Sequence, residues 1–219
     1  MDIAGLLGES ELFGEFSEDV VARIAKECSI KKFDRNHRVF GEGDEAAELY
    51  VVRSGRVAIS NRSIDGRESV VALMEDGDMF GDMGLFDQGG RSAEARALEP
   101  SQLLLVPYPP IRSLFSEQPE LLWGVVRVLS KRIRTTDSAL ADSVFLDVPG
   151  RTAKRLLELA AGEDDFVMPL TQEELAAMVG ASRERVNKAI AAFVRLGWIT
   201  QSDRRYRITD RVQLERRSH

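Results

Sequence analysis

The spacing of apolar residues changes along the chain and predicts different secondary structure in successive stretches. Residues 1–30 place apolar groups at helical intervals. From about 31 to 108, short β-rich runs alternate with glycine-containing turn signals, which is typical of an antiparallel sandwich or barrel. Gly55 and the pair Asp65–Gly66 fit tight turns, because glycine tolerates a positive φ and "DG" is a strong hairpin signal. The expected strands are "HRVF", "ELYVVRSG", "RVAIS", "SVVALM" and "QLLLVP".

From about residue 117 to 146 the apolar spacing changes from short β-rich runs to a 4-3 repeat. A 3.5-residue repeat predicts a long helix that packs against a second helix. A small sandwich cannot cover both faces of such a helix, so we expect a parallel homodimer. Thr136 interrupts the repeat, either as a polar residue that sets the register or as the place where a polar group such as a ligand reaches it. The apolar seam consists of Leu122, Val126, Leu129, Ile133, Thr136 and Leu140.

A hinge follows the long helix at "LDVPG", residues 146–150. Pro149 disfavours helix at the residue before it, and Asp147 can cap a new helix. The stretch 170–199, "LTQEELAAMVGASRERVNKAIAAFVRLGWI", then reads as helix, tight turn, helix. Thr171 and Glu174 form a capping box, Gly180 supplies the turn, and Ser182 caps the second helix. This arrangement predicts a helix-turn-helix unit.

The second helix has an apolar stripe of Val186, Ile190 and Phe193, with a polar first turn. The first turns of a recognition helix meet base edges, where arginine suits guanine and glutamate suits cytosine. A surface pair of Glu184 with Lys188 is the plain alternative, but it gives no reason for the capped turn, so we favour DNA binding. A hairpin at 198–209 would act as a wing on the phosphates. The expected DNA-binding residues are Thr171, Glu173, Ser182, Arg183, Glu184, Arg185, Asn187, Lys188 and Arg204, with Arg205 and Arg207 beside the last in the wing.

Charge and composition agree with two parts of different kind. The net charge is −6, but residues 1–149 carry 17 Lys and Arg against 26 Asp and Glu, and residues 150–219 carry 13 against 10. A basic C-terminal part suits an anionic partner. No apolar run approaches a membrane span and no signal peptide is evident, so we expect a cytoplasmic protein without membrane contact.

Few residues are available for metal or catalytic chemistry. The single cysteine, Cys28, excludes an internal disulfide and an all-cysteine metal site, and two histidines are too few for a histidine-rich one. No Ser/His/Asp constellation or P-loop is present. We therefore expect neither an enzyme nor a metal cofactor.

The stretch "FGDMGLFDQGGRS", residues 80–92, is the candidate ligand loop. Its four glycines allow backbone N–H groups to approach a ligand, and the Arg91 fork suits a phosphate. Taken alone, the pattern also fits a plain surface turn.

Four stretches together resemble the catabolite activator, or cyclic AMP receptor protein (Crp/Fnr), superfamily of bacterial transcription regulators, and most closely its actinobacterial members. They are "GEGDEAAELYVVRSGRV", "FGDMGLFDQGGRS", "DVPGR" and "LTQEELAAMVGASRERVNK". The resemblance covers essentially the whole chain. It implies an α+β fold with an antiparallel, jelly-roll-like β-roll sensor domain (1–116), a long dimerisation helix (117–146) and a winged helix-turn-helix domain (147–219).

The resemblance also implies which residues bind a cyclic nucleotide, with cyclic AMP foremost. Arg91 and Ser92 would grip the cyclic phosphate, Gly81 and Asp82 would meet the ribose, and Thr136 would meet the base. Asp82 and Asp137 depart from the family pattern. Members that bind cyclic AMP have glutamate in place of Asp82, and the partner-subunit residue beside the threonine is usually Ser or Asn, where this chain has Asp137. We therefore expect weak or altered nucleotide binding that Asp82→Glu would tighten. The full implied ligand set is Gly81, Asp82, Met83, Arg91, Ser92, Arg132, Thr136 and Asp137.

The function predicted from the sequence is that of a homodimeric, sequence-specific transcription regulator controlled by a cyclic nucleotide. Its expected partner is duplex DNA with a pseudo-palindromic operator, and RNA polymerase is a further candidate. Two alternatives stay open. One is the same DNA-binding regulator with another effector or none, and the other is a cyclic-nucleotide-binding interaction module whose helix-turn-helix contacts protein.

Overall fold

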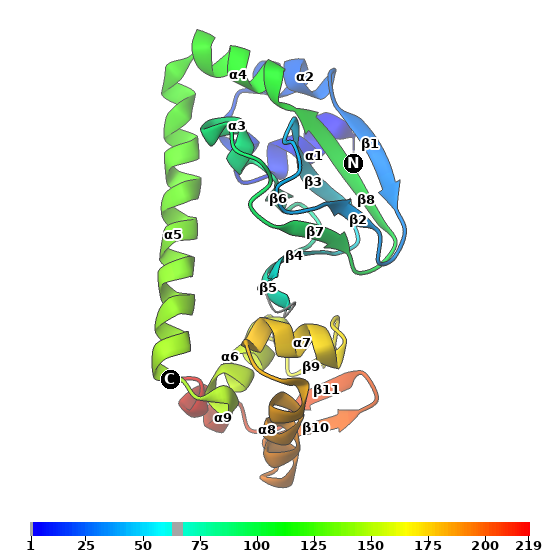
Figure 1. Ribbon diagram of the computed structural model, residues 1–219, viewed down its shortest axis with the longest axis vertical. Helices are drawn as coiled ribbons and strands as arrows, with labels where there is room; N and C mark the ends of the chain where they lie inside the picture. Colours follow the sequence, from blue (N-terminus) through cyan, green and yellow to red (C-terminus); the bar gives the residue numbers. More distant parts are fainter. Residues whose placement is uncertain (1, 63–67) are drawn as a thin grey trace. The chain divides into compact units, whose positions relative to one another are not determined.

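The computed structural model describes residues 2–62 and 68–219, which form two compact units, Met1–Ile133 and Arg134–His219 (Figure 1). Helix α5 (Leu122–Phe145) contributes its first half to the first unit and its second half to the second. No helix within the described ranges has the length and apolar character needed to cross a membrane. The same ranges hold no cluster of three or more metal-ligating His, Cys, Asp or Glu side chains.

The first unit is built on two four-stranded antiparallel sheets, as the strand pattern predicts. One has the order β1-β8-β3-β6 and the other β2-β7-β4-β5. A cluster of buried apolar side chains from both sheets, including Phe40, Val57 and Leu103, lies between them. Gly55 turns the chain at a φ of 98°; the expected "DG" turn lies outside the described residues. The strands are β1 (Ser29–Phe33), β2 (Arg38–Phe40), β3 (Glu48–Ser54), β4 (Val57–Arg62), β5 (Glu68–Met74), β6 (Met79–Phe80), β7 (Glu94–Ala97) and β8 (Ser101–Pro107).

Strands β3 and β8 are buried on both faces, which explains their nearly continuous apolar runs. On β3, Tyr50 and Val52 face the second sheet, whereas Leu49 and Val51 join a cluster with the helices. Figure 1 shows α1, α2 and α4 gathered around this helical side of the sheet. The helices of this unit are α1 (Ile3–Glu9), η1 (Phe13–Glu15), α2 (Glu18–Ala25), α3 (Met83–Asp87), α4 (Tyr108–Glu117) and η2 (Pro119–Leu121).

The long helix begins at Leu122, five residues later than the spacing predicts. Gln118 has a φ of −135° and ψ of 75°, because the following Pro119 disfavours helical geometry at the residue before it. The short 3-10 helix η2 occupies residues 119–121 and the separate helix α4 ends at Glu117, so the chain turns a corner within the range where the sequence pattern predicted one continuous helix.

The second unit has a helical core with a three-stranded sheet of order β10-β11-β9. The expected stripe of α8 is buried, with Val186, Ile190 and Phe193 at 3% exposure or less. The expected caps are also present, including the full capping box of α7 and Gly180 at a φ of 67°. The second-unit elements after α5 are α6 (Val148–Ala160), β9 (Asp165–Val167), α7 (Gln172–Val179), α8 (Arg183–Arg195), β10 (Ile199–Ser202), β11 (Arg205–Ile208) and α9 (Arg211–Arg217).

Candidate functional site

Residues 80–92, called the cassette from here on, fold around Gly81. Its φ of 74° is a conformation that glycine adopts without strain. A Cβ at this position would also lie 2.7 Å from Nη1 of Arg91. This short distance shows that the backbone at Gly81 passes close to the Arg91 side chain. The short helix α3 follows at Met83. The positive φ therefore favours glycine at position 81, and any larger residue would also displace the Arg91 guanidinium.

Arg91 is only 6% exposed although it is cationic. Its Nη1 donates to the Gly81 carbonyl oxygen at 2.8 Å and to the Tyr108 hydroxyl at 3.3 Å. The guanidinium carbon lies 4.2 Å from the centre of the Phe40 ring and 5.3 Å from that of Tyr50. Its Nε is buried and has no hydrogen-bond partner among the described residues. A buried guanidinium with an unused donor is suited to an oxyanion, which pairs charge and hydrogen bond together.

Helix α4 holds the cassette from outside. The Tyr108 hydroxyl donates to the Gly81 carbonyl oxygen, and burial raises the pKa of Tyr108, so the phenol stays protonated at neutral pH. One turn later, Arg112 donates to the carbonyl oxygens of Leu85 at 3.3 Å and Gly84 at 3.2 Å. These two residues were not among the sequence predictions. Their only sequence signal is spacing by four, which places them on one helical face.

Asp82 is buried at 3% exposure and forms an ion pair with Arg132 of α5. Nη1 of Arg132 donates to both carboxylate oxygens, at 2.8 and 2.9 Å, and Nη2 donates to the Met79 carbonyl at 3.3 Å. The pair neutralises the Asp82 charge without any ligand. A carboxylate has about four acceptor positions, so these bonds leave capacity for a ribose hydroxyl.

The other ligand residues implied by the resemblance lie at two places. Ser92 and Met83 are exposed in the cassette, where the Ser92 hydroxyl contacts the Met83 sulfur at 3.2 Å. Thr136 and Asp137 are exposed on α5 within the second unit, Thr136 one helical turn beyond Arg132. The structure thus brings Gly81, Asp82, Met83, Arg91, Ser92 and Arg132 together. Their role in binding a ligand stays a prediction.

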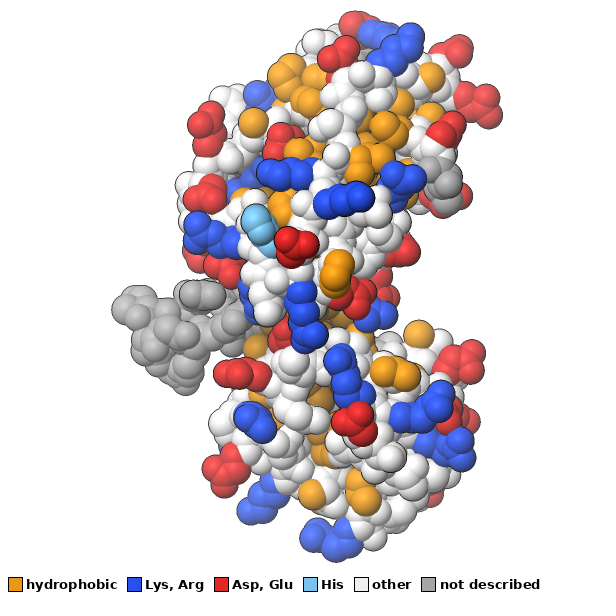
Figure 2. All heavy atoms as spheres, turned by 90° about the vertical axis from the view of Figure 1, so that its right-hand side faces the viewer, with side chains coloured by type: hydrophobic (Ala, Val, Ile, Leu, Met, Phe, Trp, Pro, Cys, Tyr) orange, Lys and Arg blue, Asp and Glu red, His pale blue; other side chains and the backbone are white. Residues whose placement is uncertain are grey.

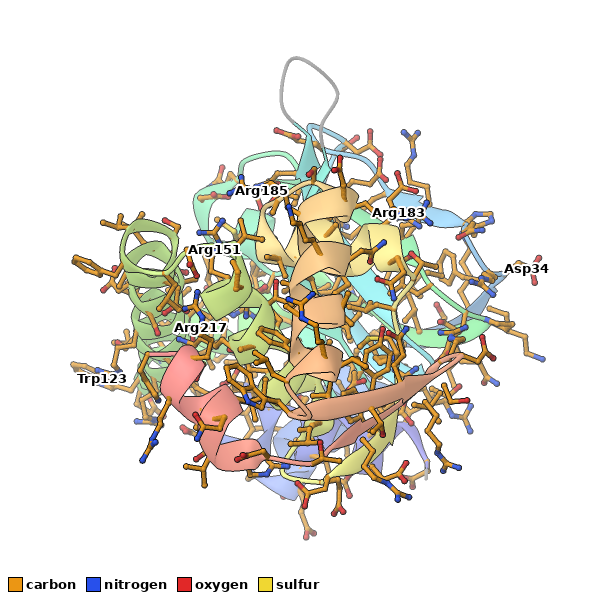
Figure 3. The ribbon with its side chains drawn as sticks, turned by 90° about the horizontal axis from the view of Figure 1, so that it is seen from below. Asp34, Trp123, Arg151, Arg183, Arg185 and Arg217 are labelled. Atoms are coloured by element: carbon orange, nitrogen blue, oxygen red, sulfur yellow. The ribbon has the colours of Figure 1, made fainter. Side chains whose placement is uncertain are left out.

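The helix-turn-helix presents its polar first turn to solvent. Ser182 caps α8 by accepting from the Arg185 N–H at 3.4 Å. Arg183 and Arg185 extend from two sides of the N-terminal end of α8 (Figure 3). Glu184 and Lys188 are exposed and Asn187 is half-buried, while Thr171 and Glu173 are exposed at the start of α7.

The wing arginines contact groups of their own unit. Nε and Nη2 of Arg204 donate to the Met168 carbonyl at 3.2 and 2.9 Å, and Nη2 also donates to Pro169. Arg205 and Arg207 both pair with Asp165, and the Arg207 hydrogen bond is the main cause that lowers the pKa of Asp165. Exposed ion pairs open at little cost, whereas Arg204 supports the backbone that leads into α7.

The distribution of surface charge and a pocket were also compared with the candidate ligand site. Figure 2 shows Lys and Arg side chains interspersed with Asp and Glu on the face in view, so charge of one sign does not dominate there.

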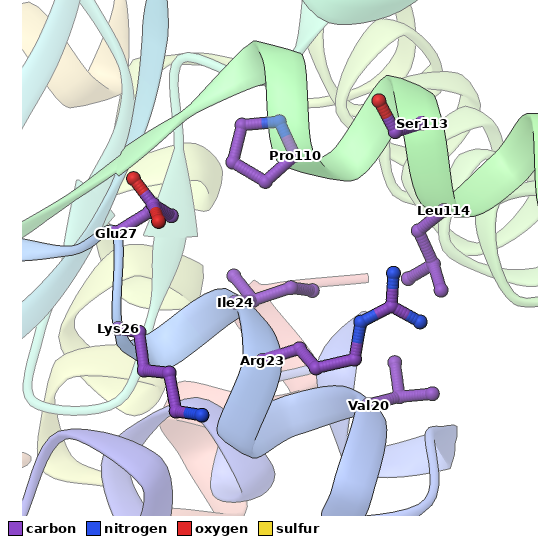
Figure 4. A pocket seen from close by; sticks show the side chains of 8 residues that line it. All are labelled: Val20, Arg23, Ile24, Lys26, Glu27, Pro110, Ser113 and Leu114. Carbon is purple, nitrogen blue, oxygen red and sulfur yellow. The ribbon is translucent and has the colours of Figure 1, made fainter.

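A pocket of about 260 Å³ lies between α2 and α4 (Figure 4), lined by Arg23, Lys26 and Glu27 among others. No cassette residue lines this pocket, so it is separate from the candidate ligand site.

Comparisons with known proteins agree with both parts of the chain. The model of the cyclic nucleotide-binding domain matches residues 30–118, and that of the Crp-like helix-turn-helix domain matches residues 150–217. The CRP-like cAMP-activated global transcriptional regulator of Mycobacterium tuberculosis is 38% identical over 220 residues, covering 97% of this chain and 98% of that protein.

Solved structures show the same fold. The c-di-GMP responsive global regulator CLP of Xanthomonas campestris is 25% identical, with a TM-score of 0.76 over 88% of this chain and 99% of that one. FixK2 of Bradyrhizobium japonicum has a TM-score of 0.80 at 18% identity, over 88% of this chain and 98% of that one.

A cyclic-nucleotide-binding-type β-roll joined to a helix-turn-helix unit defines a class of DNA-binding transcription regulators. The chain belongs to the Crp family of these regulators. The expected α+β fold with a β-roll, long helix and winged helix-turn-helix is confirmed. The M. tuberculosis relative is named as a global transcriptional regulator and CLP as a global regulator.

Proposed function

We propose that the protein is a homodimeric, sequence-specific transcription regulator whose DNA affinity is controlled by a cyclic nucleotide, cyclic AMP foremost, bound in the cassette. The observation that carries the ligand is the buried Arg91 guanidinium with its unused Nε donor. The M. tuberculosis relative is named as cAMP-activated, which supports the same ligand class. Residues 1–116 serve as sensor, α5 (Leu122–Phe145) within the expected range 117–146 as dimerisation helix, and 147–219 as DNA-binding domain. The protein acts in the cytoplasm on a pseudo-palindromic operator, with RNA polymerase as a further partner.

Each cassette group has a distinct part in holding the nucleotide. Arg91 and Ser92 bind the cyclic phosphate, Gly81 and Asp82 bind the ribose, and Met83 borders the sugar. Arg132 pairs with the Asp82 carboxylate and orients it for the ribose hydroxyl. Thr136 binds the base, with Asp137 of the second subunit beside it.

A different effector is the second candidate, and the Asp82–Arg132 pair favours it. The short aspartate side chain is already bonded on both oxygens to Arg132, so its reach toward a ribose is restricted. A structural neighbour at 25% identity is named as c-di-GMP responsive, which makes a cyclic dinucleotide the alternative to test.

The test begins with an operator selected from a random duplex library by the full-length protein. Binding to it is then followed by fluorescence anisotropy while cyclic AMP, cyclic GMP or cyclic di-GMP is added. An effector should tighten DNA binding by about five- to 150-fold. Salt dependence of binding to duplex DNA separates a DNA-binding regulator from a protein-contacting module.

Calorimetry on variants then locates the ligand. Arg91→Ala should abolish nucleotide binding, because a buried phosphate loses its charged partner, and Asp82→Glu should tighten cyclic AMP binding. Arg53→Ala removes an exposed cation of the same unit outside the cassette and is the matched control. Equal nucleotide affinity in Arg91→Ala and Arg53→Ala would rule out the cassette as the ligand site.

A further inference from the structure

Three backbone carbonyl groups from the ends of two helices face the side chain of Arg151. Nη1 donates to the Leu146 carbonyl oxygen at 2.7 Å, just beyond the last residue of α5. Nε donates to the Val179 carbonyl oxygen at 2.8 Å, at the last residue of α7, and Nη2 lies 3.5 Å from that of Gly180. Carbonyl groups at helix C-termini lack intrahelical donors and carry partial negative charge. One guanidinium therefore satisfies the ends of both helices.

These carbonyl groups lie at the end of the dimerisation helix α5 and at the turn before the recognition helix α8. Gly180 forms the turn of the helix-turn-helix, and α8 begins three residues later at Arg183. Leu146 continues the hydrogen-bonding of α5, since its N–H donates to the Asp142 carbonyl. Arg151 itself lies in the first turns of α6 (Figure 3). Its side chain thus joins the end of the dimerisation helix directly to the turn that starts the recognition helix.

Two neighbouring cations make simpler contacts. Lys154 pairs with Asp142 and so joins α6 to α5 without reaching the helix-turn-helix. Arg217 of α9 pairs with Asp147, the cap of α6. A Cβ at Gly150 would lie 3.1 Å from the Arg217 carbonyl oxygen, so a side chain there would have to displace this backbone by a few tenths of an ångström. These contacts fix the start of α6, from which Arg151 extends.

We infer that Arg151 is a positioning residue that transmits the state of the α5 C-terminus to the recognition helix, and so couples effector binding to DNA binding. This inference rests on the proposed function. The planar guanidinium presents several donors in fixed directions, so a displacement of Leu146 is passed to Val179 and Gly180 through one rigid group. A lysine ammonium is a point charge on a flexible stem and lacks this geometry.

The test compares the coupling ratio, which is DNA affinity with saturating effector divided by that without it, in full-length dimers. Arg151→Ala should lower the ratio at least fivefold, with nucleotide affinity in the absence of DNA within about threefold of wild type. Arg151→Lys should give an intermediate ratio. Lys154→Ala, which removes only the α5–α6 pair, should keep most of the wild-type coupling and is the matched control.

The outcomes separate this inference from the proposed function. A wild-type ratio of 1 for every effector would overturn the proposed function and the inference with it. A coupled wild type with an unchanged ratio in Arg151→Ala, or with an equal loss in Lys154→Ala, would overturn the inference alone. If thermal melting shows that Arg151→Ala does not fold, Arg151→Lys decides, and a wild-type ratio in that variant contradicts the inference.

Discussion

Asp82 carries a buried negative charge whose partner, Arg132, lies 50 residues later in the chain. Removal of one member of a buried ion pair leaves the other without compensation. Because Arg132 is partly exposed, we expect Arg132→Ala to lower the free energy of unfolding of the first unit by on the order of 2–3 kcal/mol. The double variant Asp82→Asn/Arg132→Ala should recover most of this loss, as measured by urea denaturation.

The control for this prediction is an exposed ion pair made by Lys131, the neighbour of Arg132 on α5. Lys131 bonds Glu11 at 2.8 Å with a side chain that is 74% exposed. Lys131→Ala should cost only a few tenths of a kcal/mol, because solvent screens such pairs. If Arg132→Ala were as mild as Lys131→Ala, or the double variant were no more stable than the single one, the pair would have no role in stability.

Single residues could be predicted from the sequence where a local motif carried them. The glycines and Arg91 of the cassette stand within 13 residues, so the sequence shows them as a candidate phosphate loop, although their spacing alone also fits a plain surface turn. The Asp82–Arg132 bond and the contact of Tyr108 with Gly81 join distant segments that only the fold brings together. Arg151 stood in the quoted motif "DVPGR", but its three acceptors are backbone carbonyls, which leave no trace in side-chain patterns.

At the scale of the element, substitutions in α8 and in the wing should affect DNA binding differently. Arg183 is exposed at the first turn of α8 and is free to reach base edges. Arg183→Ala should cost on the order of 1–3 kcal/mol at a cognate half-site and relax the preference at one base pair. Competition binding with single-base operator variants measures both effects. An unchanged sequence preference would show that α8 is not the reading element.

Arg204 should behave differently, because its guanidinium is occupied by the Met168 and Pro169 carbonyls. Arg204→Ala should weaken binding to all duplexes alike through loss of support before α7. The slope of log affinity against log salt should stay nearly constant, since few phosphate contacts are lost. A slope reduced by about one would instead assign Arg204 to a phosphate.

Elements were predictable where capping and apolar spacing agreed, as in α7 and α8. Strand β7 was missed because its Glu94 and Arg96 are polar, although Glu94 is only 9% exposed. Nε of Arg96 lies 4.0 Å from Oε1 of Glu94, so the buried Glu94 carboxylate has a cationic partner on its own strand. Helix α4 was missed because its first turn contains two prolines, Pro109 and Pro110, which suit only the start of a helix.

For the whole molecule, the exposed seam of α5 is the feature that demands a partner. Large apolar side chains are 38–64% exposed along it in a single chain. Full burial of one such side chain contributes about 1.5–3 kcal/mol, so covering the seam strongly favours association. The exposed seam positions are Leu122, Val126, Leu129, Ile133 and Leu140.

Ile133→Asp should therefore convert the dimer to monomers, because two-fold symmetry would place two carboxylates against each other within an apolar seam. Sedimentation velocity measures the assembly, and Ser138→Asp, an exposed position of α5 outside the seam, controls for the added charge. A dimer reads two half-sites about one helical turn apart, roughly 34 Å. The monomer should bind the full pseudo-palindrome no more tightly than an isolated half-site, whereas Ser138→Asp should keep the preference for the full site. A dimer of unchanged stability in Ile133→Asp would show that the α5 seam is not the interface, and a monomer that still prefers the full site would show that α5 does not set half-site spacing.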